Sequence, residues 1–164
     1  GHTSMMAAPA SFAAKKVLLV VCIAGNFGMD DWKKITPPAD AEDILTIGAI
    51  DNMGVNAAFS SIGNTADGRI KPDVMAMGVH SAVVGVDGGT AFANGTSFAS
   101  PIFCGLVACL WQACPWLTVR QLIQVVHEAS DRNAYPDNIY GYGVTDMWKA
   151  YQLAMKLKAD TDGK

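Results

Sequence analysis

An α/β fold with a mostly parallel sheet flanked by helices is predicted from three observations. Two apolar runs rich in branched residues, 17–23 (VLLVVCI) and 44–50 (ILTIGAI), are typical of strands buried on both faces. Segments with helical periodicity alternate with such runs, as in βαβ units. With 164 residues, 51% of them hydrophobic and 16% charged, the chain can bury a core and is not intrinsically disordered.

The first half of the chain is expected to contain one helix and three strands. Residues 4–16 are Ala-rich and predict a helix, in which Pro9 indicates a kink or a late start. The two apolar runs form the first two strands. Residues 74–76 predict a short third strand.

The second half is expected to be helical after a Gly-rich segment at residues 85–95. A long helix over residues 97–114 is apolar all round, which is typical of a helix in a domain interior. Thr118 predicts the N-cap of a third helix with one apolar face. Thr145 predicts the cap of a final helix through about residue 156.

Charge, hydropathy and cysteine spacing exclude several classes of protein. The chain has 12 Lys and Arg against 15 Asp and Glu, a net charge of -3 and no basic block, which argues against a nucleic-acid partner. Its most apolar run, 101–111, is too short for a membrane span of about 20 residues. The 4 cysteines form no C-x-x-C pair, so we expect buried free thiols and no metal site.

The segment that opens the long helix has the residue types of a nucleophile. Ser97 stands among small residues at the expected helix N-terminus, beside backbone N–H groups without intrahelical partners and the positive end of the helix dipole. That position suits a hydroxyl whose attack creates an oxyanion. Gly95 lets a substrate backbone approach closely. On position alone, however, a plain N-cap role explains Ser97 more simply.

A second candidate follows the first apolar run. Ala24, Gly25 and Asn26 come at its carboxyl end, and ligands of open parallel sheets bind beyond such ends. The amide of Asn26 can serve there as a fixed neutral donor. A turn asparagine is the commoner alternative when this segment is taken alone.

Together these segments resemble the subtilisin-like serine proteases. Residues 95–101 (Gly-Thr-Ser-Phe-Ala-Ser-Pro) are similar to that family's nucleophile block, and residues 24–26 to its oxyanion-hole block. Residues 47–49, 59–74 (Phe-Ser-Ser-Ile-Gly through Lys-Pro-Asp-Val) and 140–143 also resemble family segments, in the family's order. The resemblance covers about residues 17–150.

The resemblance implies a three-layer fold and a role for each matching residue. Ser97 would be the nucleophile of a serine endopeptidase, with the side chain of Asn26 and the N–H of Ser97 as oxyanion donors. Ala24 and Gly25 would border the pocket for the residue before the scissile bond, and Gly95 and Thr96 would also meet substrate. The chemistry needs no cofactor, although structural calcium is an option in the full-length protein. A secreted or cell-envelope location and a protein or peptide substrate follow by analogy.

Half of the family's catalytic machinery is missing from the sequence. Its triad runs Asp, His, Ser along the chain, and neither the Asp-(Ser/Thr)-Gly nor the His-Gly-Thr block occurs here. His2, His80 and His127 are each expected to be solvated or already partnered rather than catalytic. A serine without a base is a weak nucleophile, so we expect the isolated chain to be inactive.

Residues 1–164 are therefore interpreted as the C-terminal part of a catalytic domain, a piece of something longer, without a signal peptide or initiator Met. The expected partner is the missing N-terminal half of the domain or a second copy of the chain. A non-catalytic binding or structural module with the same fold is the alternative. A phosphate-binding module is disfavoured, because residues 85–95 contain neither G-x-G-x-x-G nor a P-loop lysine.

Overall fold

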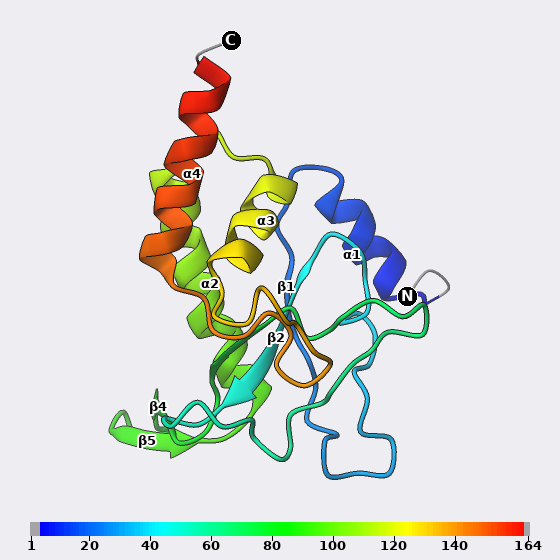
Figure 1. Cartoon of the computed structure of the whole chain (residues 1–164). Coiled ribbons are helices and arrows are strands. Elements are labelled where there is room, and N and C mark those ends of the chain that lie inside the picture. Colours follow the sequence, from blue (N-terminus) through cyan, green and yellow to red (C-terminus); the bar gives the residue numbers. More distant parts are fainter. Residues whose placement is uncertain (1–3, 163–164) are drawn as a thin grey trace.

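The computed structural model describes residues 4–162 and contains a small parallel sheet, four helices and a separate hairpin within that range (Figure 1). In chain order the elements are α1 (Ala7–Ala14), β1 (Val21–Ile23), β2 (Leu45–Ile50), β3 (Val74–Met77), β4 (Ser81–Val84), β5 (Thr90–Ala93), α2 (Thr96–Ala113), α3 (Val119–Ala129) and α4 (Met147–Asp162).

The strand β2 is the centre of the sheet. The order is β1-β2-β3 with both pairs parallel; Val21 lies opposite Leu45, and Ile47 opposite Val74. Every residue of β2 is buried. Its uninterrupted apolar run is thus explained by burial on both faces, as the sequence predicts.

Two apolar clusters on opposite faces of the sheet give the expected three layers. Alternate β2 residues Leu45, Ile47 and Ala49 pack in one large cluster with α2, α3 and α4. On the other side, Val20 and Cys22 pack with α1 and Ile44. The prediction of an α/β fold with a parallel sheet between helices is confirmed.

The predicted first strand is shorter and more exposed than the sequence indicates. Only Val21–Ile23 pairs, Ile23 is exposed, and Val17 lies at a positive φ of 68° outside the ladder. The prediction of a strand over residues 17–23 buried on both faces is therefore wrong. Among the described strands β1 pairs only with β2, so one edge of it has no neighbour to bury its apolar side chains.

The long helix α2 is buried on one side only. Phe103, Val107 and Leu110 belong to the large cluster, whereas Ile102 and Leu106 are 43% and 44% exposed. In the described range α2 is apolar and long enough to cross a bilayer, so the length argument from residues 101–111 does not hold for the whole helix. Core helices can share this property, and α2 packs on the sheet. The prediction that this helix lies in the domain interior is therefore wrong for its outer side.

The helix starts follow the predictions in two cases and depart from them in one. Helix α1 begins late, which leaves Pro9 in its first turn where its missing N–H costs nothing. Thr118 caps α3 in a capping box with Gln121, as predicted. The expected cap of α4 is wrong: Asp146 accepts the N–H groups of Trp148 and Lys149, while Thr145 bonds Ser130.

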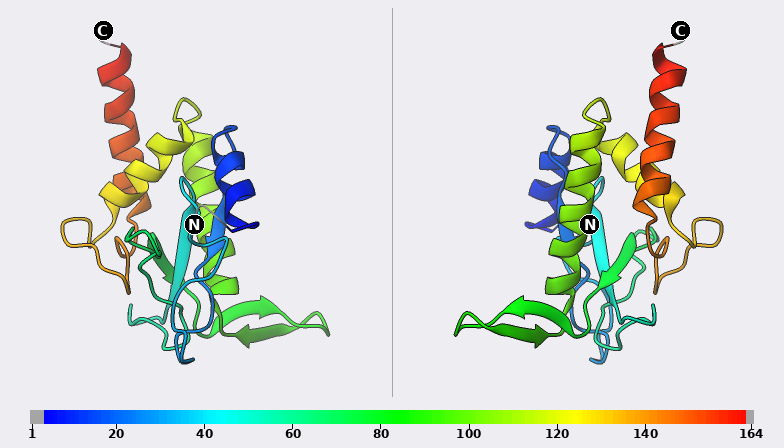
Figure 2. Two further views of the ribbon diagram at one scale, coloured as in Figure 1. Left: turned by 90° about the vertical axis from the view of Figure 1, so that its right-hand side faces the viewer. Right: turned by 90° about the vertical axis from the view of Figure 1, so that its left-hand side faces the viewer.

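The Gly-rich segment forms the turn and the second strand of a hairpin that the sequence does not predict. Strands β4 and β5 are antiparallel and project from the rest of the molecule (Figure 2). The glycines at residues 85, 88 and 89 lie in the connecting turn, and their density conceals the strand pattern on each side.

The prediction of buried free thiols holds in part. All four cysteines are free. Cys114 is buried, and burial raises the pKa of its thiol. Cys104 and Cys109 are exposed, contrary to expectation, because both lie on the outer side of α2.

Candidate active site

The two predicted functional segments meet at the carboxyl end of β1. The chain leaves β1 at Ile23 and reaches Asn26 three residues later, while α2 begins at Thr96. A hydrogen bond of 2.9 Å from the N–H of Thr96 to Oδ1 of Asn26 joins them across 70 residues of sequence. The fold therefore brings Asn26 next to the residue that precedes Ser97.

Both donors of Thr96 fix the orientation of the Asn26 amide. The Thr96 hydroxyl also donates to Asn26 Oδ1, again at 2.9 Å. Because both bonds go to the oxygen, the Nδ2 group must point elsewhere, and it lies near the Cα of Gly95: a Cβ built there would be 3.7 Å from it. Asn26 itself is exposed. It thus presents two N–H donors from a fixed position, which suits it to an anion rather than to a turn alone.

Ser97 is the second residue of α2 and is exposed. The N-cap of α2 is Gly95, so the simple N-cap explanation of Ser97 is wrong. The N–H of Ser97 belongs to the first helical turn and has no intrahelical acceptor. Its hydroxyl and N–H are thus both available at the positive end of the helix dipole.

Two glycines make this arrangement possible. Gly25 has a φ of 109°, and a Cβ there would lie 2.8 Å from the Oγ of Ser61. Gly95 has a φ of 150°, and its N–H donates to the carbonyl of Gly78 at 2.8 Å. Both backbone conformations favour glycine, so a side chain at either position would strain the site.

Ser61 supports the site, and sequence reasoning gave it no role. It is buried; its Oγ accepts the N–H of Phe27 at 3.0 Å, and its own N–H donates to the carbonyl of Gly25 at 2.9 Å. These bonds clamp the backbone on both sides of Asn26. The available signal was a small hydroxyl residue inside a segment that resembles the family, which does not reveal its contacts.

The remaining predicted site residues lie next to Asn26 and Ser97 in the chain, but all four are buried. Ala24 is fully buried with Ile35 and Ala39, and Thr96 is fully buried against Asn26. Thr96 therefore acts on the site through Asn26. Substrate contacts of Ala24, Gly25, Gly95 and Thr96 stay predictions.

The two described histidines, His80 and His127, contact other residues and not Ser97. His127 Nε2 lies 3.2 Å from Oδ1 of Asp73, and its ring stacks on Tyr142. His80 stacks on Phe92 with ring centroids 4.1 Å apart. His2 lies outside the described residues. Between residues 4 and 162, no hydrogen bond or ion pair connects Ser97 to a histidine or a carboxylate.

A buried charged cluster holds the sheet to α3 away from Ser97. Lys71 and Asp73 form a buried ion pair, and Oδ2 of Asp73 accepts the N–H of Thr46 at 2.6 Å. Burial alone would raise the pKa of Asp73, but Lys71 and then His127 outweigh it, so this pKa lies below its ordinary value. Within the described chain, no three His, Cys, Asp or Glu side chains gather as a metal site requires.

Comparison with known proteins assigns the family. The model of the Subtilase family (Peptidase S8) matches residues 2–143. The chain belongs to the subtilase family. The site geometry coincides with the family resemblance, because its nucleophile and oxyanion-hole blocks are the two segments that Asn26 and Thr96 join.

Several relatives and solved structures are similar to the chain. Serine protease AprX of Bacillus subtilis is 33% identical over 152 residues, covering 78% of this chain and 34% of AprX. Membrane-bound transcription factor site-1 protease of Homo sapiens is 33% identical over 158 residues, covering 88% of this chain and 14% of that protein. The self-cleaved protease domain of PatA has a TM-score of 0.73 at 26% identity, covering 89% of this chain and 53% of that domain. The chain thus spans about a third or less of these curated relatives.

Proposed function

We propose that this chain is the nucleophile-bearing part of a serine endopeptidase. Ser97 attacks the carbonyl carbon of a peptide bond; the C–N bond breaks, an acyl-enzyme forms on Ser97, and water later releases the acyl group. The negative charge that develops on the carbonyl oxygen is stabilised by Nδ2 of Asn26 and the N–H of Ser97. The observation that carries the proposal is the fixed amide of Asn26, whose oxygen is held by Thr96.

Activity requires a base that the described residues do not place beside Ser97. We propose that the Asp and His of the triad come from the portion of the protease domain that precedes this chain in other family members. The chain alone is then inactive, because a serine hydroxyl needs a neighbouring base to become nucleophilic. The lack of a base beside Ser97 among the described residues is also compatible with the alternative, a non-catalytic module with this fold.

The surface that would receive this portion includes an open strand edge and an uncharged helix side. The strand β1 has an open edge, and α2 packs directly against β1. Ile102 and Leu106 are exposed on the outer side of α2, and the helix contains no charged residue. A partner that adds a strand to β1 and covers α2 would bury both features. A second copy of this chain is the other candidate.

The test is reconstitution with the N-terminal half of the AprX protease domain. Incubated alone with a fluorophosphonate probe, the chain should remain unlabelled; mixed with that half, it should be labelled at Ser97 and cleave casein. Ser97→Ala should abolish both, and Asn26→Ala should lower turnover about 100- to 1,000-fold, the loss known for the equivalent donor in subtilisin, a member of this family. Labelling of the chain alone would contradict the missing base. No labelling in the mixture would favour the non-catalytic module.

A matched pair of variants tests the surface. Leu106→Asp places a charge on the outer side of α2 and should prevent reconstitution, whereas Phe12→Asp on α1 should not. Equal reconstitution of both variants would contradict this docking surface. Light scattering of the chain alone would show whether a second copy occupies it.

Two further expectations rest on the family alone. A secreted or cell-envelope location is testable by fractionating the source cells. Structural calcium in the full-length protein is testable by a shift in its melting temperature on chelation.

A further inference from the structure

The hairpin β4–β5 presents an exposed apolar face directly before the candidate nucleophile. Ala82 lies opposite Phe92, and Val84 opposite Thr90; these four residues are exposed, while the other residues of both strands are half-buried or buried. Phe92 is 57% exposed and Val84 is 84% exposed. We call Ala82, Val84, Thr90 and Phe92 the hairpin face.

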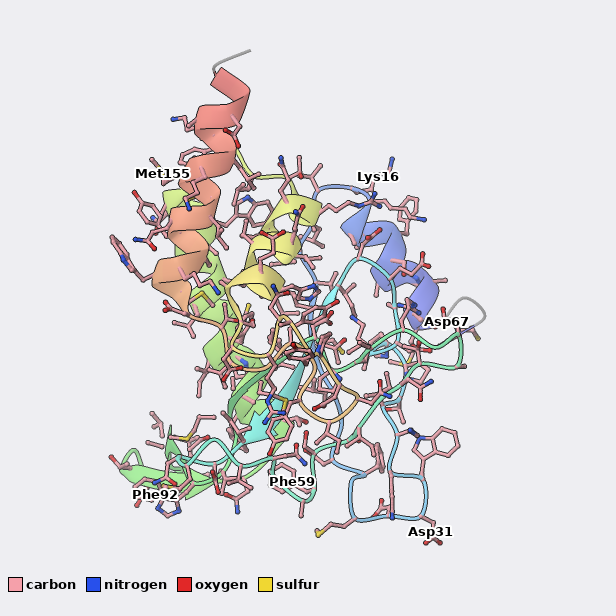
Figure 3. All side chains as sticks on the ribbon, in the orientation of Figure 1. Lys16, Asp31, Phe59, Asp67, Phe92 and Met155 are labelled. Atoms are coloured by element: carbon pink, nitrogen blue, oxygen red, sulfur yellow. The ribbon has the colours of Figure 1, made fainter. Side chains whose placement is uncertain are left out.

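The hairpin is held rigidly at its base. The N–H of His80 donates to Oδ1 of Asn94 at 2.6 Å, so the residue before β4 is tied to the residue after β5. The ring of His80 stacks on Phe92 with an interplanar angle of 7°. These contacts fix the side chain of Phe92, which Figure 3 shows on the projecting hairpin.

Apart from the ring of His80 on Phe92, nothing in the described structure covers this face, although its residues are mostly apolar. An isolated two-stranded hairpin is marginal in water and gains stability from a further strand or a packed surface. The single charged residue between His80 and Asn94 is Asp87, in the turn. The hairpin also keeps open strand edges, which are ready to pair with an extended chain.

We propose that the hairpin face binds the extended polypeptide substrate through a large apolar side chain remote from the scissile bond. This inference rests on the proposed function. Continuity with the site favours a substrate over another occupant: β5 ends at Ala93 and the chain then passes through Gly95 to Ser97. The hairpin is thus the element that leads directly into the candidate nucleophile, so an extended segment that passes Ser97 needs only a short reach to contact it.

The reach of the hairpin sets which substrate residue is contacted. Phe92 precedes Ser97 by five residues, a span of at most about 17 Å in extended chain. Side chains on one face of an extended substrate recur about every 7 Å. The contacted residue is thus about two to five positions from the scissile bond, and shorter peptides do not reach it.

The test measures binding without turnover, in the complete chain carrying Ser97→Ala. A ten-residue peptide with Phe at alternate positions is titrated and followed through backbone amide NMR shifts, beside a peptide of the same length with Ser in place of Phe. The Phe peptide should bind about tenfold more tightly than the Ser peptide, with shifts concentrated at the hairpin, since one buried aromatic contributes about this much. A four-residue version should lose the difference.

Variants of matched type locate the contact. Phe92→Ser should weaken binding of the long peptide about tenfold, Phe92→Leu should retain most of it, and Phe12→Ser, a comparably exposed Phe on α1, should change nothing. Shifts confined to the outer side of α2, no preference for the Phe peptide, or equal affinity of the Phe92→Ser and Phe12→Ser variants would each overturn the proposal.

The two proposals fail separately. If the reconstituted protein is not labelled at Ser97 but the hairpin binds the Phe peptide, the protease proposal fails and the hairpin is a peptide-binding element. If labelling succeeds and the hairpin binds no peptide, the protease proposal stands and the hairpin inference fails.

Discussion

The two sides of α2 both lack charged residues but have opposite surroundings. The inner side places Phe103, Val107 and Leu110 in the large core cluster, whereas the outer side leaves Ile102 and Leu106 in solvent. A helix without charged residues is stable in water only if both sides are covered. The difference shows that this chain covers only one side of α2; the proposed partner would cover the other.

Truncation on the two sides gives the largest expected contrast. Phe103→Ala should lower the free energy of unfolding by about 3–5 kcal/mol, because it leaves a cavity between α2 and the sheet. Leu106→Ala should change it by less than about 1 kcal/mol in the isolated chain, since that side chain already contacts water. Urea denaturation followed by circular dichroism measures both. Similar losses would mean that the outer side is already covered in solution.

The packing of the sheet against α3 also depends on the charge of Asp73. Asp73→Asn should cost about 3–5 kcal/mol, because it leaves the buried Lys71 without its counter-charge. The matched control is Asp30→Asn, at an exposed position in the loop after β1.

The pH dependence of the parent chain follows from the same group. The folded pKa of Asp73 lies below the ordinary 3.8, so its stabilisation is complete above that value and is lost as the pH falls further through the folded pKa. Urea midpoints measured between pH 6 and pH 2 should fall most steeply below about pH 4. An Asp73→Asn chain with the same acid dependence as the parent would contradict the assignment.

The reactivity of the cysteine thiols tests, without mutation, whether the outer side of α2 is exposed. Cys104 and Cys109 on the outer side are exposed, while Cys114 is buried with a raised pKa. Iodoacetamide should modify the first two at least about tenfold faster, because it reacts with accessible thiolate. In the mixture with the AprX half, both should become protected. Unchanged modification there would place the partner elsewhere.

The smallest effect is expected where α2 meets Asn26. Thr96→Val removes one of the two hydrogen bonds to Asn26 Oδ1 and should slow fluorophosphonate labelling of the reconstituted protein about 2- to 12-fold. Thr96→Ser keeps the hydroxyl and should restore the rate. A Thr96→Ser protein as slow as Thr96→Val would assign the loss to packing of the methyl group instead.

Much of the fold could be predicted from the sequence where burial is complete. β2 and α3 were predictable because their patterns record one fixed environment: burial on both faces for β2, and one apolar face behind a capping box for α3. The prediction failed at residues 17–20, on the outer side of α2 and in the hairpin. In the first two cases apolar side chains are exposed at an edge, and in the third glycines interrupt the strand pattern.

The family and the two segments of the candidate site follow from the sequence alone, because the spacing of residues around Ser97 and Asn26 is local information. How these segments meet depends on packing. Asn26 and Thr96 are 70 residues apart, and the hydrogen bonds that orient the amide exist only once β1 and α2 are packed together. The clamp by Ser61 and the exposure of the outer side of α2 are also properties of packing. Side-chain orientation and exposure depend on what surrounds a residue in space, and neighbours in sequence do not determine that.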